Sequence, residues 1–275
     1  MESTNQYKQI IQLAFDTVAP GYDHPSLAFF PETAAHIVQQ LKLEDDLHLL
    51  DVCTGTGMVA LTAAEQLPRG KVTGIDLSSG MLQQAQQKAA QRGLENTEFI
   101  QMDLDYLDLA SNSFDVAISS FGLFFLQDMQ SALSNIVATV KPGGRVAISS
   151  FTGNAFDPFS RIFLERYQSF GMEVPDLSWK RLATPDNISA LFESVALGNI
   201  QYHHLPLAYA IEQPQQWWDV VWNAGYRGLL NQLSDEQQEQ FKQQHFDEIR
   251  ELLKAGKLWM ETEVILAIGH KANEH

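Results

Sequence analysis

The chain has 275 residues, of which 45% are hydrophobic and 19% charged, so it can bury a sizeable core. Its formal net charge of −16 disfavours a polyanionic partner such as DNA or RNA. The single cysteine excludes an internal disulfide and fits a reducing compartment. Neither a leader-type apolar segment nor a run near the roughly 18 apolar residues that span a bilayer is present. We therefore expect a cytoplasmic protein with no membrane segment.

The first half of the chain begins with two expected helices, over residues 5–17 and 31–43, separated by the helix-breaking pair Pro20 and Gly21. The segment HLLDVCTGTGMVAL, residues 48–61, then predicts a buried strand ending at Asp51, a glycine-rich turn and a helix start. Such a turn presents backbone N–H groups and a helix N-terminus to a ligand. Its glycines are Gly55 and Gly57, two residues apart, whereas a nicotinamide site usually has GxGxxG.

The next strands also end in polar residues. A strand over 72–75 ends at Asp76, 25 residues after Asp51, which is about the spacing at which a second carboxylate meets a ribose diol. A third strand ends at Asp103, whose carboxylate can accept a hydrogen bond from an adenine amino group. A fourth strand begins at 114 and runs into a hydrophobic loop, and a turn and fifth strand occupy 140–151. Helices after Gly57, over about 79–93 and over 129–140 connect them. The carboxyl edge of such a sheet is where ligands bind.

The second half has a different pattern. Residues 154–179 are rich in aromatic side chains. Thr184 followed by proline predicts a helix start, and this helix is expected to run to about Leu197. We expect a sixth strand over 199–211, helices over 213–256 with a capping box from Ser234 to Gln237, and a seventh strand over 260–271.

Residues 45–152 resemble the class I S-adenosylmethionine (SAM)-dependent methyltransferases. They are most similar to the branch that includes the ubiquinone/menaquinone-biosynthesis C-methyltransferases. The resemblance rests on FDTVAPGYD at 15–23, DVCTGTG at 51–57, GIDLSSGML at 74–82, VKPGG at 140–144 and the terminal TEVILAIGHK. One residue departs from the family pattern D-x-G-x-G-x-G: Cys53 stands where a glycine is common. We interpret Cys53 as a small, buried apolar residue.

The resemblance implies an α/β fold. It is a Rossmann-like, seven-stranded, mostly parallel sheet of order 3-2-1-4-5-7-6, with the last strand antiparallel, helices on both faces and a helical cap. The expected organisation is a single methyltransferase domain over 1–275. Within it we expect an N-terminal cover at 1–30, a cofactor-binding core at 31–152, cap insertions at 153–183 and 212–258, and segments 184–211 and 259–275 completing the core.

The resemblance also implies that SAM binds and that S-adenosylhomocysteine is the product. The backbone at 55–57 faces the methionine moiety, Asp51 holds its ammonium, Asp76 takes the ribose hydroxyls, and Asp103 and Leu104 contact adenine. Ser119 would offer its carbonyl to the ammonium. The predicted cofactor-binding residues are Tyr22, Asp51, Cys53, Thr54, Gly55, Thr56, Gly57, Asp76, Leu77, Met81, Asp103, Leu104 and Ser119.

The methyl acceptor is expected to be a small molecule against an aromatic wall. The predicted acceptor residues are Phe121, Phe124, Phe151, Phe156, Trp218, Trp222 and Arg227, with Phe125, Trp217 and Tyr226 as further candidates. No tight acid–base constellation stands out, and the weak catalytic candidates are His24, His203 and His204. No residue spacing is typical of a metal site.

Two other functions remain open at this stage. The chain could be a SAM-binding protein whose cap serves a partner without catalysis. It could also be a nicotinamide-dependent oxidoreductase, although the glycine spacing and Asp103 argue against that function. A fold alone does not decide between these functions.

Overall fold

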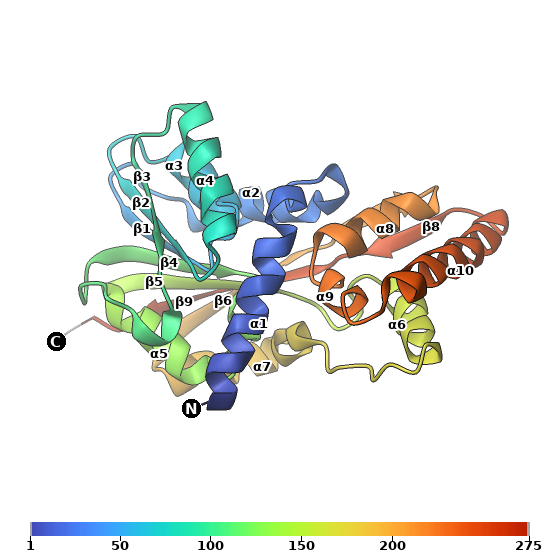
Figure 1. The fold of residues 1–275 in the computed structure, drawn as a ribbon. Coiled ribbons are helices and arrows are strands. Elements are labelled where there is room, and N and C mark those ends of the chain that lie inside the picture. The colour runs from blue at the N-terminus through green and yellow to red at the C-terminus, as the bar shows by residue number, and fades with distance from the viewer. Residues whose placement is uncertain (1, 274–275) are drawn as a thin grey trace.

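The computed structural model describes residues 2–273, with side chains from residue 6 onward, and a seven-stranded sheet runs through it (Figure 1). Its order is β3-β2-β1-β4-β5-β9-β6. The first five of these strands are parallel, and β9 pairs antiparallel with both β5 and β6. This confirms the predicted fold and strand order. The strands are β1 (His48–Val52), β2 (Lys71–Asp76), β3 (Thr97–Gln101), β4 (Phe114–Ser120), β5 (Val140–Phe151), β6 (Leu197–Leu205) and β9 (Val264–Lys271).

Helices cover both faces of the sheet because successive strand residues point to opposite sides. Leu49 of β1 belongs to the buried cluster under α2 (Phe29–Leu41) and α3 (Met58–Ala64). The next residue, Leu50, belongs to the cluster under α5 (Met129–Thr139) and α7 (Pro185–Ser194). The remaining helix of the core, α4 (Ser79–Arg92), packs beside β3. These helices confirm the predicted ones, except that α7 ends earlier than expected, because Ala196 turns the chain at φ +59° into β6.

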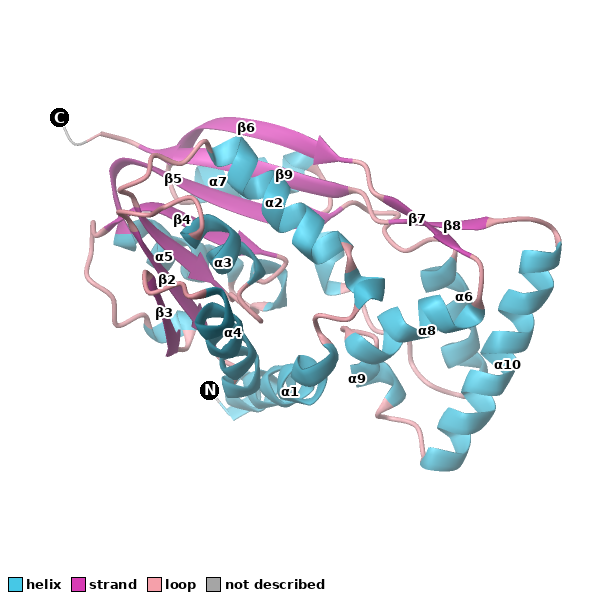
Figure 2. Ribbon diagram, turned by 90° about the horizontal axis from the view of Figure 1, so that it is seen from above, coloured by secondary structure: helices cyan, strands magenta, loops and turns pink. Residues whose placement is uncertain are grey.

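Two predicted continuous strands are each broken in the structure, which corrects the expectation for 199–211 and 260–271. The first divides into β6 and β7 (Ala208–Ile211), and the second into β8 (Leu258–Glu261) and β9. The break in the first follows from Pro206, which has no N–H for the ladder. Opposite it, the Thr262 N–H donates to the Leu207 carbonyl at 2.8 Å. Strands β7 and β8 therefore form a separate two-stranded ribbon that leads away from the sheet (Figure 2).

The cap is built on that ribbon and consists of α6 (Phe159–Ser169), α8 (Pro214–Asn223), α9 (Arg227–Leu230) and α10 (Asp235–Lys254). The predicted capping box is present, with the Ser234 hydroxyl accepting from the Gln237 N–H. One buried hydrophobic cluster extends from Leu50 in the sheet to Phe241 in α10. The cap and the sheet thus share a core.

The N-terminal helix α1 (Glu2–Val18) lies between the sheet domain and the cap, contacting α4 on one side and α9 on the other (Figure 2). Two short 3₁₀ turns, η1 (Ala19–Gly21) and η2 (Pro25–Leu27), connect it to α2. Within residues 2–273, no helix is long and apolar enough to span a bilayer.

Candidate active site

The loop after β1 forms the floor of the site. Cys53, Gly55 and Gly57 have φ values of +55°, +55° and +81°, the left-handed region that glycine adopts most easily. Asp51 is 1% exposed, and its Oδ2 accepts hydrogen bonds from Thr54 Oγ1 at 2.6 Å and from the Ala60 N–H at 3.0 Å. Burial raises the pKa of the Asp51 carboxyl to about 7. Burial therefore disfavours the ionised form of Asp51, and a cation beside it would stabilise that form.

The carboxylate of Asp76 is anchored at the end of β2. Its Oδ2 accepts from the Gly55 N–H at 2.8 Å, and its Oδ1 accepts from the Ser78 N–H at 2.9 Å. Burial also raises the pKa of Asp76. Because each carboxylate oxygen can accept two hydrogen bonds, both oxygens retain capacity for a ligand.

Asp103, two residues past β3, is paired with a cation that sequence analysis did not identify. The ammonium of Lys8 lies 2.9 and 2.7 Å from its two carboxylate oxygens and 2.5 Å from Oδ2 of Asp105. Since Lys8 belongs to α1, this contact joins the N-terminal helix to the third strand.

Two further carboxylates hold the N-terminal segment against the core. Asp16 of α1 accepts from the Ser78 hydroxyl at 2.6 Å and from the Gly80 N–H at 2.9 Å. Asp23 accepts from the Thr56 hydroxyl at 2.6 Å and pairs with Lys88 at 2.6 Å. The segment thereby closes over the carboxyl ends of the parallel strands.

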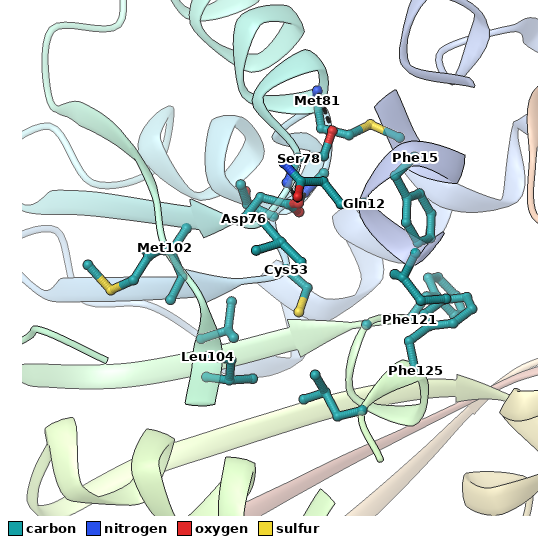
Figure 3. Close-up of a pocket in the computed structure, with 18 of the residues that line it drawn as sticks. Gln12, Phe15, Cys53, Asp76, Ser78, Met81, Met102, Leu104, Phe121 and Phe125 are labelled. Atoms are coloured by element: carbon teal, nitrogen blue, oxygen red, sulfur yellow. Dashed lines mark hydrogen bonds between the residues drawn. The ribbon is translucent and has the colours of Figure 1, made fainter. Parts of the chain in front are cut away.

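A cavity of about 280 Å³ lies beneath this cover (Figure 3). Gly57 and Ser119 do not line it. Gly57 precedes α3, where a Cβ would press on Ala85, and Ser120 lines the cavity in place of Ser119. Eleven of the predicted cofactor residues do line it: Tyr22, Asp51, Cys53, Thr54, Gly55, Thr56, Asp76, Leu77, Met81, Asp103 and Leu104.

A second cavity, of about 180 Å³, adjoins the first and is mostly aromatic. Among the residues that the structure describes, no Lys, Arg or His side chain lines it, and Asp176 is the one charged residue in its wall. Phe121 stacks on Phe151 with ring centroids 4.3 Å apart, and Phe156 meets Phe151 edge to face. The two cavities share five lining residues: Phe15, Tyr22, Phe30, Phe121 and Phe125.

Four of the seven predicted acceptor residues line this second cavity: Phe121, Phe124, Phe151 and Phe156. Tyr226 and Phe125 line it as well. Trp218, Trp222 and Arg227 do not line this cavity; from this part of the cap, Val220 of α8 and Ala224 just after it do.

The other cap side chains have structural contacts instead. Trp218 packs against α10, and the Arg227 guanidinium lies over the partly exposed ring of Trp222. Trp217 also misses the cavity, since its indole N–H donates to His245 Nε2 at 2.9 Å.

None of the three candidate histidines lines either cavity. His24 Nδ1 accepts from the Ser26 N–H at the start of η2. His203 and His204 lie on the edge strand β6, near His36 and Glu263 respectively. Among the described residues, no group of His, Cys, Asp and Glu could hold a metal ion.

Comparison with known proteins agrees with this architecture. A family model described as a methyltransferase domain matches residues 49–144. The ubiquinone/menaquinone biosynthesis C-methyltransferase UbiE of Geotalea daltonii is 30% identical over 220 residues, covering 73% of this chain and 93% of that protein. A demethylmenaquinone methyltransferase of Lactiplantibacillus plantarum is 28% identical, covering 72% and 92%. For the fold, the crystal structure of YcgJ from Bacillus subtilis is 20% identical, with a TM-score of 0.59 over 88% of this chain and 99% of that one.

The chain therefore belongs to the class I SAM-dependent methyltransferases, of the ubiquinone/menaquinone C-methyltransferase type. It is an enzyme that transfers a methyl group from SAM to a small-molecule acceptor. The oxidoreductase and non-enzymatic alternatives have no support in these comparisons.

Proposed function

We propose that SAM occupies the first cavity, with its amino-acid end over the loop after β1 and its adenosine end beside β2 and β3. In this arrangement Asp51 holds the ammonium, Asp76 accepts from the ribose hydroxyls, and Asp103 with the Leu104 N–H contacts adenine. The observation that carries the proposal is that carboxylates from three successive strands line a single cavity.

The chemistry of Asp51 supports the fit. Among side chains that the structure describes, no cation pairs with this carboxylate, although it is almost fully buried. A buried charge without a partner is costly, so the ligand's ammonium would stabilise the ionised form. At Gly55, a Cβ would meet nothing within 4 Å, which leaves space for a ligand against the loop.

The acceptor that the second cavity favours is uncharged and carries a flat aromatic ring. Aromatic side chains stack on such a ring and contribute beyond area burial. A phosphate or carboxylate would lose its hydration beside Asp176 and find no described cation in the wall. The relatives named for demethylmenaquinone support an acceptor ring of the quinol kind.

Methyl transfer at this site depends on alignment. The sulfonium of SAM supplies an activated methyl group, so the chain has to orient the acceptor and exclude water. The shared wall of Phe121, Tyr22 and Phe30 brings the two cavities into contact. Among the residues that the structure describes, no histidine lines either wall, which favours an acceptor whose oxygen or carbon is already nucleophilic.

The remaining parts of the proposal concern the whole chain. The N-terminal segment 1–30 acts as a cover, 31–152 binds the cofactor, and 153–183 with 212–258 form the acceptor cap; 184–211 and 259–275 complete the core. The net charge of −16 supports an enzyme with no nucleic-acid partner, and the single cysteine supports a cytoplasmic location.

The proposal is tested with SAM carrying an isotopically labelled methyl group and two acceptors, 1,4-naphthoquinol and phosphoethanolamine. We expect label in the quinol and none in the phosphorylated amine. Phe124→Leu should raise the KM for the quinol, while the matched variant Trp222→Phe, outside the cavity, should not. Equal labelling of both acceptors would contradict the acceptor class.

A further inference from the structure

In the loop after β4, residues 123–128, the backbone carbonyls accept hydrogen bonds from side chains of other segments. Arg181 donates to the carbonyl oxygens of Phe124 at 3.2 Å, Leu126 at 2.5 Å and Gln127 at 3.1 Å. The Tyr7 hydroxyl donates to the carbonyl of Phe125 at 3.0 Å. Four successive carbonyls are thus bound by two side chains that are remote in sequence.

The two donors come from the two segments that cover the site. Tyr7 belongs to α1, and Arg181 belongs to the 3₁₀ helix η5 (Ser178–Leu182). Burial raises the pKa of Tyr7, and the positive charge of Arg181 partly opposes this effect, so the two groups are close to each other. Both covers therefore converge on the same short loop.

The loop itself lines both cavities. Phe124 faces the acceptor cavity, Phe125 faces both, and Leu126, Gln127 and Asp128 face the cofactor cavity. The segment that carries Arg181 supplies Ser178 and Trp179 to the acceptor wall. Arg181 therefore links η5, which borders the acceptor cavity, to Leu126 and Gln127 in the wall of the cofactor cavity.

We propose that Arg181 is a positioning residue that couples the acceptor cavity to the cofactor cavity by fixing the 123–128 loop. The proposal rests on the function proposed above. A planar guanidinium with several fixed donors can bind three carbonyls at once, which a lysine ammonium cannot reproduce in the same geometry. Arg181 lines neither cavity; it acts through the backbone of Phe124, Leu126 and Gln127.

The first test measures the loop directly, by amide hydrogen exchange in the whole protein with S-adenosylhomocysteine bound. Arg181→Gln should speed exchange of the 123–128 amides about tenfold, whereas exchange in β1 and α3 stays unchanged. The matched control is Arg161→Gln, since Arg161 is an exposed cap arginine paired with Glu165. Unchanged exchange in the 123–128 loop of Arg181→Gln would overturn the proposal.

The second test separates positioning from stability. With labelled SAM and 1,4-naphthoquinol, Arg181→Ala should lower kcat/KM about 10- to 100-fold, in line with loss of charged hydrogen bonds. The dissociation constant of S-adenosylhomocysteine should change less than threefold. Because the side chain is exposed, added guanidinium ion should restore part of the rate in Arg181→Ala and none in Phe124→Leu.

The outcomes distinguish the two proposals. If the wild-type enzyme fails to methylate the quinol while Arg181→Gln still loosens the loop, the acceptor class fails and the positioning role stands. Wild-type turnover in Arg181→Ala, or an equal loss in Arg161→Gln, would overturn the positioning role. If Arg181→Ala does not fold, Arg181→Lys serves in its place, with faster loop exchange and a reduced rate expected.

Discussion

The ammonium of Lys8 lies 2.7 Å from Oδ2 of Asp103, so the N-terminal helix is tied to the carboxylate expected at the adenine end of the site. Both side chains are less than one third exposed, at 18% and 27%. The pair therefore joins α1 to the end of β3 in the wall of the first cavity.

Lys8→Met should speed release of S-adenosylhomocysteine by roughly two- to fivefold, since partly exposed ion pairs contribute about 0.2–1 kcal/mol. Stopped-flow displacement measures this rate. Lys254→Met is the matched control, because Lys254 forms an exposed pair within α10. Identical release rates in the Lys8 variant and the wild type would show that the pair does not hold the cover.

Asp76→Ala should weaken S-adenosylhomocysteine binding by about 1.5–3 kcal/mol, roughly 10- to 150-fold, through the loss of hydrogen bonds to a charged group. Calorimetry gives the dissociation constant. Because Asp76 also accepts from the Gly55 N–H, Asp76→Asn is made in parallel to retain one acceptor. A folded Asp76→Ala variant that binds as tightly as wild type would rule out the ribose role.

Cofactor binding should depend on pH through Asp51. Its folded-state pKa of about 7 lies above the ordinary value of 3.8, so the ligand-free protein binds an extra proton between these two pH values. The contribution of this group to stability is therefore present at low pH and falls as pH rises through that window. The charged form is the one that binds an ammonium, so the affinity for S-adenosylhomocysteine should rise with pH up to about 7 and then level.

Calorimetry from pH 5.5 to about 8 in Asp51→Asn should give weaker binding that depends less on pH than in the wild type. Asp45→Asn is the control, since Asp45 is exposed and pairs with Arg69. A wild-type affinity that does not vary with pH would contradict an ionic contact at Asp51.

Cys53 and Gly122 should be energetically coupled. A side chain at Gly122 would collide with Cβ of Cys53. Gly122→Ala should thus cost about 1–3 kcal/mol of unfolding free energy in the wild type and at least 1 kcal/mol less in the Cys53→Gly background. Urea denaturation of the four proteins gives the coupling, and additive effects would disprove it.

Replacing His24, His203 or His204 singly by alanine should lower kcat less than about tenfold, because none of these side chains lines a cavity. A lost general base typically costs 10²–10⁴-fold. A loss in that range in a folded variant that still binds S-adenosylhomocysteine would identify a catalytic residue that the geometry does not suggest.

The sequence was most informative where a feature of the site is formed by residues that are adjacent in the chain. The turn from Asp51 to Gly57 depends on backbone conformation and on one carboxylate, so its residue pattern predicts the loop. The strand order comes from the family resemblance and not from this pattern. The individual ligand contacts of these residues stay predictions. The sequence did not predict the roles of Lys8, Tyr7 and Arg181, because each of them contacts a partner more than 50 residues away along the chain.

The cap shows the opposite case. Apolar periodicity in α8 predicts a buried face, but it does not tell whether that face meets a cavity or another helix. Trp218 meets α10, while the smaller Val220 and Ala224 line the cavity. The small residues leave the room that a ligand needs, and this volume is a property of the assembled fold.

The most direct test of the proposed site is a crystal structure of the enzyme with S-adenosylhomocysteine. We expect the ligand's ammonium at Asp51, its ribose hydroxyls at Asp76, and its sulfur facing Phe121 and the aromatic cavity beyond. A ligand bound elsewhere, or one whose sulfur faces away from the cavity lined by Phe151 and Phe156, would contradict the proposed site.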